Sequence, residues 1–200
     1  LDNNDNYPSG FPDNAASDGC TGTCQETTVT EPSTAVYACS ATGVRPSANI
    51  TWFQARRACE NSGKFLCNLP SDWLYSCQSG VGDEYPYGNT YVPQRCNDGW
   101  RGVGHSEPGG MLNACKGQGF AATIYDMSGN VWEWTSTDFG PFPGFEVDPY
   151  KDYSLPWFHT RKVMRGGCWV TRSRLIRTQY RNFMTPDRRD VLTGFRTCAR

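Results

Sequence analysis

The residues best suited to chemistry lie in one stretch, YDMSGNVWEWTS at residues 125–136, where two carboxylates flank a glycine-bearing turn. Side chains alternate along a strand, so Trp132 and Trp134 would share one face while Glu133 lies on the other. One face then supplies two apolar rings to a core, and the other supplies a carboxylate beside turn carbonyls. This mixture of carboxylate and carbonyl oxygens suits a hard cation such as calcium. The alternative is that Glu133 pairs with an arginine of the tail and Asp126 caps the turn.

Candidates for thiol, imidazole or serine chemistry are few. Cys168 follows two glycines and could act as a nucleophilic or redox thiol, but with nine other cysteines in the chain a structural disulfide is favoured. His105 and His159 stand alone, whereas a histidine-rich metal centre needs two or three convergent imidazoles. We expect both to form local hydrogen bonds. No GxSxG elbow and no glycine-rich phosphate loop is present.

The ten cysteines are an even number, spread along the chain without the clustered spacing of zinc sites. Disulfides are therefore favoured over reduced structural thiols, and each would stabilise the fold by about 2–4 kcal/mol. Because such bonds persist in oxidising compartments, we expect a secreted or cell-surface protein, extracellular or periplasmic. No signal peptide precedes Leu1, so the numbering is expected to start after processing.

Composition favours one loop-rich domain. Two hundred residues, 38% of them hydrophobic, can bury a core of ordinary size. The 21 glycines and 13 prolines interrupt the chain every few residues, which predicts short helices, many turns and an α+β fold. Residues 1–19 are acidic and poor in apolar side chains, so we predict a flexible arm there and a single domain over residues 20–200.

Two helices are predicted. Thr51 and Gln54 have the spacing of a capping box, and Gly63 marks the end of the first helix. Its predicted buried face is Phe53, Ala55, Ala58 and Cys59. A second short helix is predicted over residues 71–79, followed by Gly80, with Trp73, Leu74 and Cys77 facing inward.

The rest of the chain divides into loops and strands. Residues 85–120 are predicted to form loops held by Cys96 and Cys115. Strand-like runs follow at VWEWTS, KVMRGGCWV, LIRTQYRNF and TGFRTCAR.

Charge is distributed unevenly. Residues 1–44 hold six acids and no Lys or Arg, whereas residues 161–200 hold eleven bases and two acids. The tail arginines alternate with apolar residues instead of forming a run, so we predict internal pairing with carboxylates and no nucleic-acid partner. The arginines concerned are Arg165, Arg172, Arg174, Arg177 and Arg181. No stretch reaches the roughly 18 apolar residues of a membrane span.

Several sequence blocks, in order, carry a family resemblance: TWFQARRACENSGKFL, YPYGN, YDMSGNVWEW, VMRGGCW and a terminal GFR. Over about residues 45–200 the chain resembles the formylglycine-generating enzyme and sulfatase-modifying factor family. The resemblance implies a variant of the C-type lectin fold. The family's usual strands before the first helix are replaced here by the short stretch Cys20–Gly43.

The resemblance also implies what chemistry is missing. Family oxidases hold copper with two cysteines, three and eight residues after the serine of a GGS motif. Here that motif is Gly166, Gly167 and Cys168, and the two cysteine positions fall on Thr171 and Ile176. Neither residue supplies the thiolate that Cu(I) requires, so no copper centre and no catalytic residue is expected.

Calcium and disulfides are implied by the same resemblance. A family calcium site maps onto the Asp126 side chain, the Gly129 and Val131 carbonyls and the Glu133 side chain, which predicts a structural calcium. A second family site maps less specifically onto Asn97 and Asp98. Disulfides are implied between Cys59 and Cys198 and, more loosely, between Cys96 and Cys115.

Together these features predict a secreted, calcium-stabilised binding or structural module without catalysis. Its protein or glycan ligand is expected at the loops of residues 82–120 and 137–160, the latter dense in aromatics. One alternative is an oxidase with a relocated copper or thiol site near Cys168. Another is a subunit of an extracellular surface assembly or filament that self-associates through the N-terminal arm.

Overall fold

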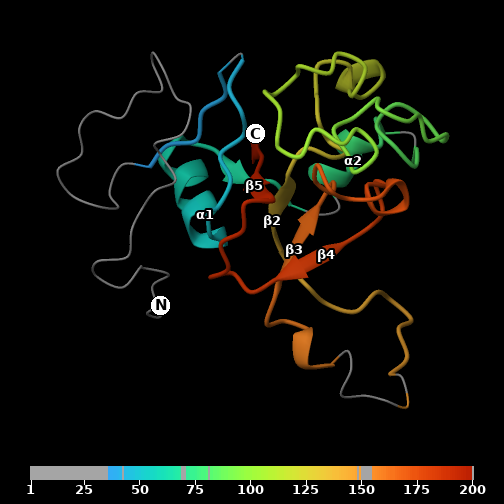
Figure 1. Ribbon diagram of the computed structural model, residues 1–200. Helices are drawn as coiled ribbons and strands as arrows, with labels where there is room; N and C mark the ends of the chain where they lie inside the picture. The colour runs from blue at the N-terminus through green and yellow to red at the C-terminus, as the bar shows by residue number, and fades with distance from the viewer. Residues whose placement is uncertain are drawn as a thin grey trace.

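The computed structural model describes residues 36–41, 43–68, 71–80, 82–147, 149 and 155–199. The arm of residues 1–19, Cys20 and Cys24 lie outside these residues, so the division into arm and domain stays a prediction. The described chain has two short helices, several helical turns and six short strands joined by long loops (Figure 1). This is the α+β, loop-rich organisation that the composition predicts.

Helix α1 (Trp52–Asn61) begins at the predicted capping box. The Thr51 hydroxyl accepts from the Gln54 amide at 3.2 Å, and the Gln54 side chain accepts from the Thr51 amide at 3.1 Å. The two bonds satisfy backbone donors that the first turn would otherwise leave without partners. Gly63, with φ +66°, follows the helix end and adopts the left-handed conformation that glycine favours.

The buried face of α1 differs from the prediction at its first turn. Ala55, Ala58 and Cys59 are buried as expected, but Trp52 is buried and Phe53 is only partly so. Trp52 takes the inner place because its indole N–H reaches the Thr135 carbonyl, at 2.8 Å. Helix α2 (Trp73–Cys77) buries both of its end residues.

A four-stranded mixed sheet, ordered β4-β3-β2-β5, forms the centre of the domain. Strand β2 (Trp132–Asp138) pairs antiparallel with β3 (Lys162–Arg165) and parallel with β5 (Thr193–Phe195). Strand β4 (Asn182–Met184) lies at the edge beside β3. A separate pair, β1 (Phe65–Leu66) and β6 (Thr197–Cys198), joins the helix region to the tail.

Two of the strand-like runs are strands over only part of their length. The run LIRTQYRNF enters a strand only at Asn182, and the helical turn η4 (Ser173–Leu175) lies at its start. Strand β3 ends at Arg165 because Gly166 and Gly167 have φ values of +88° and +82°, outside the β region. The chain therefore turns at these two glycines, although the sequence run predicted as a strand continues past them.

The alternation predicted for β2 is present. Trp132 and Trp134 both belong to the main hydrophobic core, which also contains α1 residues and Met164 of β3. Glu133, between them, points to the other side and contacts Trp73 of α2. Strand β2 thus separates an apolar core from a layer containing buried charge.

Two disulfides close loops between described cysteines. Cys96 is joined to Cys115, the pairing suggested from the sequence. Cys198 is joined to Cys67 across 131 residues, so the predicted partner Cys59 is wrong. The reason is the β1-β6 pairing, which places Cys198 opposite Phe65. Cys67 follows Phe65 by two residues, whereas Cys59 is buried in α1. In the chain-entropy model a loop of this length contributes about 4–5 kcal/mol.

Candidate functional site

The first candidate site is formed by Thr171 and Ile176, the positions onto which the resemblance maps the family's copper cysteines. An ideal Cβ on Gly167 would lie 2.5 Å from the Ile176 side chain and 3.2 Å from the Thr171 side chain. The two positions therefore converge on one point, as a pair of metal ligands would need. Ile176 is fully buried and Thr171 nearly so, and together they fill this point with a methyl-bearing side chain each.

Cys168 lies beside this point but is closed to solvent. Its sulfur is 3.2 Å from the Thr171 hydroxyl, and its side chain is fully buried. Burial raises the pKa of the thiol, which keeps it protonated and weakly nucleophilic at neutral pH. The predicted disulfide of Cys168 is not formed with any described cysteine.

The second candidate site is the carboxylate of Glu133. It accepts from Arg196 Nη2 at 2.7 Å and from Arg196 Nε at 3.1 Å on both oxygens, and Trp73 Nε1 donates at 2.5 Å. The arginine belongs to the terminal GFR block, which β5 brings beside the WEW block. Two residues that are 63 positions apart in the sequence thus meet as an ion pair, at a side-chain exposure of 7% for the glutamate.

This arrangement does not fit the predicted calcium ligand set. The guanidinium already neutralises Glu133 and occupies both of its oxygens, and Asp126 accepts from the Gly110 amide at 2.7 Å. Placing a divalent cation beside the Arg196 guanidinium would add repulsion, because the charge of Glu133 is already compensated. Among the residues that the structure describes, no group of three or more His, Cys, Asp or Glu is arranged to hold a metal ion.

At the second mapped calcium site, one oxygen that could coordinate calcium has no hydrogen-bond partner. The side-chain oxygen of Asn97 is buried and has no hydrogen-bond partner, while its amide donates to the His105 carbonyl at 3.0 Å. Asp98 is instead engaged locally, accepting from Tyr91 at 2.7 Å and from the Trp100 amide at 3.0 Å. Among the described side chains mapped to calcium, only Asn97 has a buried oxygen without a hydrogen-bond partner.

The prediction that the tail arginines pair with carboxylates is largely wrong. Of the five, only Arg177 forms an ion pair with a described acid, Glu84, at 3.4 Å. Arg165 is buried, stacks over the Trp73 ring at 5.1 Å, and donates to the carbonyls of Thr178 and Gln179. Backbone carbonyls and an indole face take the place of carboxylates, and burial lowers the pKa of this guanidinium to about 10.

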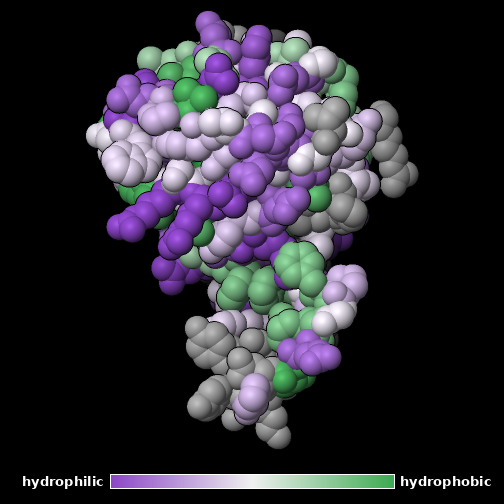
Figure 2. All heavy atoms as spheres, turned by 90° about the vertical axis from the view of Figure 1, so that its right-hand side faces the viewer, coloured by the Kyte–Doolittle hydropathy of each residue, from purple (hydrophilic) through white to green (hydrophobic). Residues whose placement is uncertain are grey.

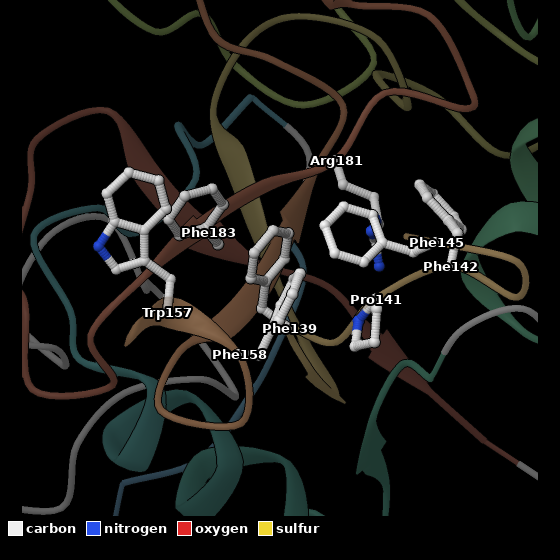
Figure 3. Close-up of a pocket in the computed structure, with 8 residues that line it drawn as sticks. All are labelled: Phe139, Pro141, Phe142, Phe145, Trp157, Phe158, Arg181 and Phe183. Carbon is white, nitrogen blue, oxygen red and sulfur yellow. The ribbon is translucent and has the colours of Figure 1, made fainter. Parts of the chain in front are cut away.

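The third candidate site is an open pocket of about 210 Å³ on the segment between β2 and β3. This segment projects from the body of the domain (Figure 1), and Figure 2 shows hydrophobic side chains gathered on the narrow projecting part. Seven of the eight lining residues are apolar or aromatic, and the eighth is an arginine (Figure 3). They are Phe139, Pro141, Phe142, Phe145, Trp157, Phe158, Arg181 and Phe183.

The aromatic rings hold one another in place. Phe139 stacks on Phe183 with centroids 4.0 Å apart, and Trp157 lies 5.4 Å from the same ring. Phe145 meets Phe158 edge to face at 5.4 Å. Such pairs are worth about 0.5–1.5 kcal/mol beyond burial, so the loop is braced by its own rings together with Phe183 of β4.

The sequence pointed to this loop but not to the residues that complete the pocket. Residues 137–160 were expected to contact a ligand, and the pocket lies there. Arg181 and Phe183 come from the tail and reach the loop because β4 is paired with β3 next to it. A strand-like alternation of arginine and aromatic residues was the only signal available.

His105 and His159 lie outside the pocket lining, and the ring of His105 contacts only the neighbouring Ser106 carbonyl among described hydrogen bonds.

Comparisons with known proteins agree with the motif resemblance. The family model described as sulfatase-modifying factor enzyme 1-like domain matches residues 16–200. Hercynine oxygenase of Mycolicibacterium smegmatis is 29% identical over 168 residues, which is 77% of this chain and 37% of that protein. The inactive C-alpha-formylglycine-generating enzyme 2 of Bos taurus is 29% identical over 173 residues, or 77% of this chain and 50% of the relative.

A third relative, the formylglycine-generating enzyme of Streptomyces coelicolor, is 30% identical over 171 residues, covering 77% of this chain and 52% of the relative. The chain thus spans about half or less of each of these relatives. Solved structures share the fold at low identity. PvdO from Pseudomonas aeruginosa has a TM-score of 0.57 at 19% identity, covering 76% of this chain and 61% of that one.

Treponema denticola variable protein 1 has a TM-score of 0.56 at 17% identity, over 76% of this chain and 70% of that one. The family model covers all of the described residues, and the WEW, RGG and GFR blocks that carry the resemblance meet around one strand. The chain therefore belongs to the sulfatase-modifying factor enzyme 1-like domain family.

Proposed function

We propose that this domain is a non-catalytic binding module, which takes its ligand at the aromatic pocket between β2 and β3. One observation carries the proposal. The copper positions of the family's oxidases are filled by buried Thr171 and Ile176, whereas the projecting loop carries an open pocket lined almost entirely by aromatic rings. Aromatic side chains give large contact areas and are enriched where proteins bind ligands.

A location outside the cytoplasm is part of the proposal. The two disulfides support it, since bonds of this kind persist in oxidising compartments. Among the described residues, no helix has the length and apolar character needed to cross a bilayer.

Calcium stays a prediction for this domain. The ion pair of Glu133 argues against the site predicted around that residue, and the free buried oxygen of Asn97 favours the second position. A carbonyl-type oxygen is a normal calcium ligand, although calcium takes six to eight of them.

The two alternative functions have less support. An oxidase centred on Cys168 would need an accessible thiolate, and this thiol is fully buried with a raised pKa. Assembly through residues 1–19 involves a segment outside the described residues and stays a prediction. The loop of residues 82–120, the other expected contact region, exposes Trp100 and Met111.

The proposal is tested with a short capped, uncharged peptide that carries a central asparagine-phenylalanine pair. The titration is followed by NMR of the tryptophan indole N–H groups. Binding of the peptide is expected to shift the indole signal of Trp157. Phe142→Ala, which removes a pocket wall that is 60% exposed, should weaken binding about five- to tenfold. Tyr75→Ala is the matched control, since Tyr75 is 56% exposed and stacks on Phe120 outside the pocket.

Besides a failure of the peptide to bind, two results would overturn the proposal. One is that Phe142→Ala and Tyr75→Ala weaken the peptide equally, which would mark the binding as non-specific. The other is copper-dependent conversion of a cysteine-containing peptide to an aldehyde by the unmodified domain.

A further inference from the structure

The pocket contains one charged group, the guanidinium of Arg181, and its surroundings are unusual for an arginine. It lies 3.6 Å from the Phe142 ring centroid and 4.9 Å from that of Phe139, measured from the guanidinium carbon. In Figure 3 the side chain reaches into the cluster of rings from above. The cation is therefore held against two aromatic faces, within the range of cation–π attraction.

Among the described residues, hydrogen bonds use only a small part of this guanidinium. One nitrogen, Nη1, donates to the Gly140 carbonyl at 2.9 Å, and an arginine has five N–H donors. No described carboxylate forms an ion pair with Arg181, and no acid is among the described residues that line the pocket. Burial lowers the pKa of the guanidinium, so its charge is incompletely compensated where it stands.

The cavity volume limits what can bind beside this charge. An engineered apolar cavity of about 150 Å³ holds one benzene molecule. The 210 Å³ of this pocket is sufficient for one aromatic ring together with a small polar group. A sugar would need several hydrogen-bond partners, but apart from Arg181 and the Trp157 indole the lining side chains are hydrocarbon.

The rim indicates that the ligand is part of a chain. Phe142 is 60% exposed, Phe145 41% and Val147 51%, so apolar contact surface continues beyond the volume that one ring fills. A peptide can place one side chain in the pocket while its neighbours cover this rim. A free small acid would leave the rim in water.

We infer that the pocket selects a peptide segment in which an aromatic side chain lies next to a carboxylate, with the ring among the phenylalanines and the carboxylate on Arg181. This rests on the proposed function and adds the charge and class of the ligand. Arginine suits the role because its planar fork matches both carboxylate oxygens and still stacks on a ring. The inference favours a protein over a glycan at this loop.

The test replaces the asparagine of the neutral capped peptide with aspartate and compares the two dissociation constants. The acidic peptide is expected to bind about tenfold more tightly at low salt, and the ratio should shrink as ionic strength rises. Arg181→Gln should reduce the ratio to about one while the neutral peptide still binds. Arg181→Lys keeps the charge without the planar fork and should give an intermediate ratio. This variant is the control for a loss of binding caused by loosening of the loop.

Equal affinity for the two peptides would overturn this inference and leave the proposed function intact. Binding of neither peptide would overturn both. If 3-phenylpropanoate bound as tightly as the acidic peptide, the pocket would be a site for small acids, and the peptide assignment would be wrong.

Discussion

The carboxylate of Glu133 lies 2.7 Å from the guanidinium of Arg196, so the WEW and GFR blocks are joined by a buried ion pair. Trp73 of α2 donates to the same carboxylate at 2.5 Å. The pair therefore ties strand β2, the C-terminal tail and the second helix together on the side of the sheet opposite the main core. It also gives the glutamate a structural role that needs no metal.

Glu133→Gln is expected to lower the free energy of unfolding by about 3–5 kcal/mol, because it leaves the Arg196 guanidinium without its counter-charge. Urea unfolding measures the change. Arg196→Met combined with Glu133→Leu should cost less than the sum of the two single changes, since the pair is removed together. A loss of stability in Glu133→Gln that is present only when calcium is supplied would contradict the ion-pair interpretation.

Calcium is expected to act through Asn97 and not through Glu133. If a structural ion is bound, adding 1 mM calcium to protein treated with a chelator should raise the thermal midpoint of wild type and of Glu133→Gln by the same amount. Asn97→Ala should abolish that increase, because it removes the buried oxygen that has no partner. A calcium effect lost in Glu133→Gln but kept in Asn97→Ala would restore the originally predicted site.

Restoring the family's thiol pair should restore copper binding. The side chains of Thr171 and Ile176 converge on Gly167, so Thr171→Cys and Ile176→Cys are expected to place two sulfurs close together. Both changes are made with Cys168→Ser, which regenerates the GGS motif and removes a competing thiol beside Thr171. The triple variant should bind one Cu(I) per chain, measured by competition with a chromophoric chelator.

Cys168→Ser alone is the matched control for this experiment and should bind no copper at that chelator concentration. Failure of a folded triple variant to bind would show that the two positions are not a copper site in this chain.

Native Cys59 should resist alkylation strongly. Burial raises the pKa of its thiol from 9.0 to about 12, so the proton is retained in the folded chain between those pH values and lost on unfolding. The contribution of this thiol to the free energy of unfolding is therefore lost as pH rises from about 9 to about 12. At pH 9 the thiolate fraction alone makes labelling on the order of 500-fold slower than in the unfolded chain.

A pulse of iodoacetamide followed by mass spectrometry measures the labelling of Cys59. Unfolding without reductant should expose Cys59, Cys77 and Cys168 to label while Cys67 and Cys198 stay protected. Labelling of Cys67 with protection of Cys59 would restore the pairing first implied by the family resemblance.

The sequence by itself determined the parts that depend on neighbouring residues and on shared family blocks. The capping box of α1 needs only residues three apart, and the separation of Trp132 and Trp134 from Glu133 needs only the two-residue repeat of a strand. The family is also readable from residue order, as are the threonine and isoleucine at the two positions that the resemblance assigns to copper cysteines. The placement of a ligand-binding loop at residues 137–160 remains a prediction, based on its aromatic content.

Only the tertiary structure decided which distant groups meet. Cys67 replaced Cys59 because the pairing of β1 with β6 sets the register, and one-dimensional spacing carries no information on that pairing. Arg196 reached Glu133 through the parallel pairing of β5 with β2, and Arg181 reached the aromatic loop through β4. A buried carboxylate is equally suited to a cation or to a guanidinium, so its role is set by whichever partner the fold brings within hydrogen-bonding distance.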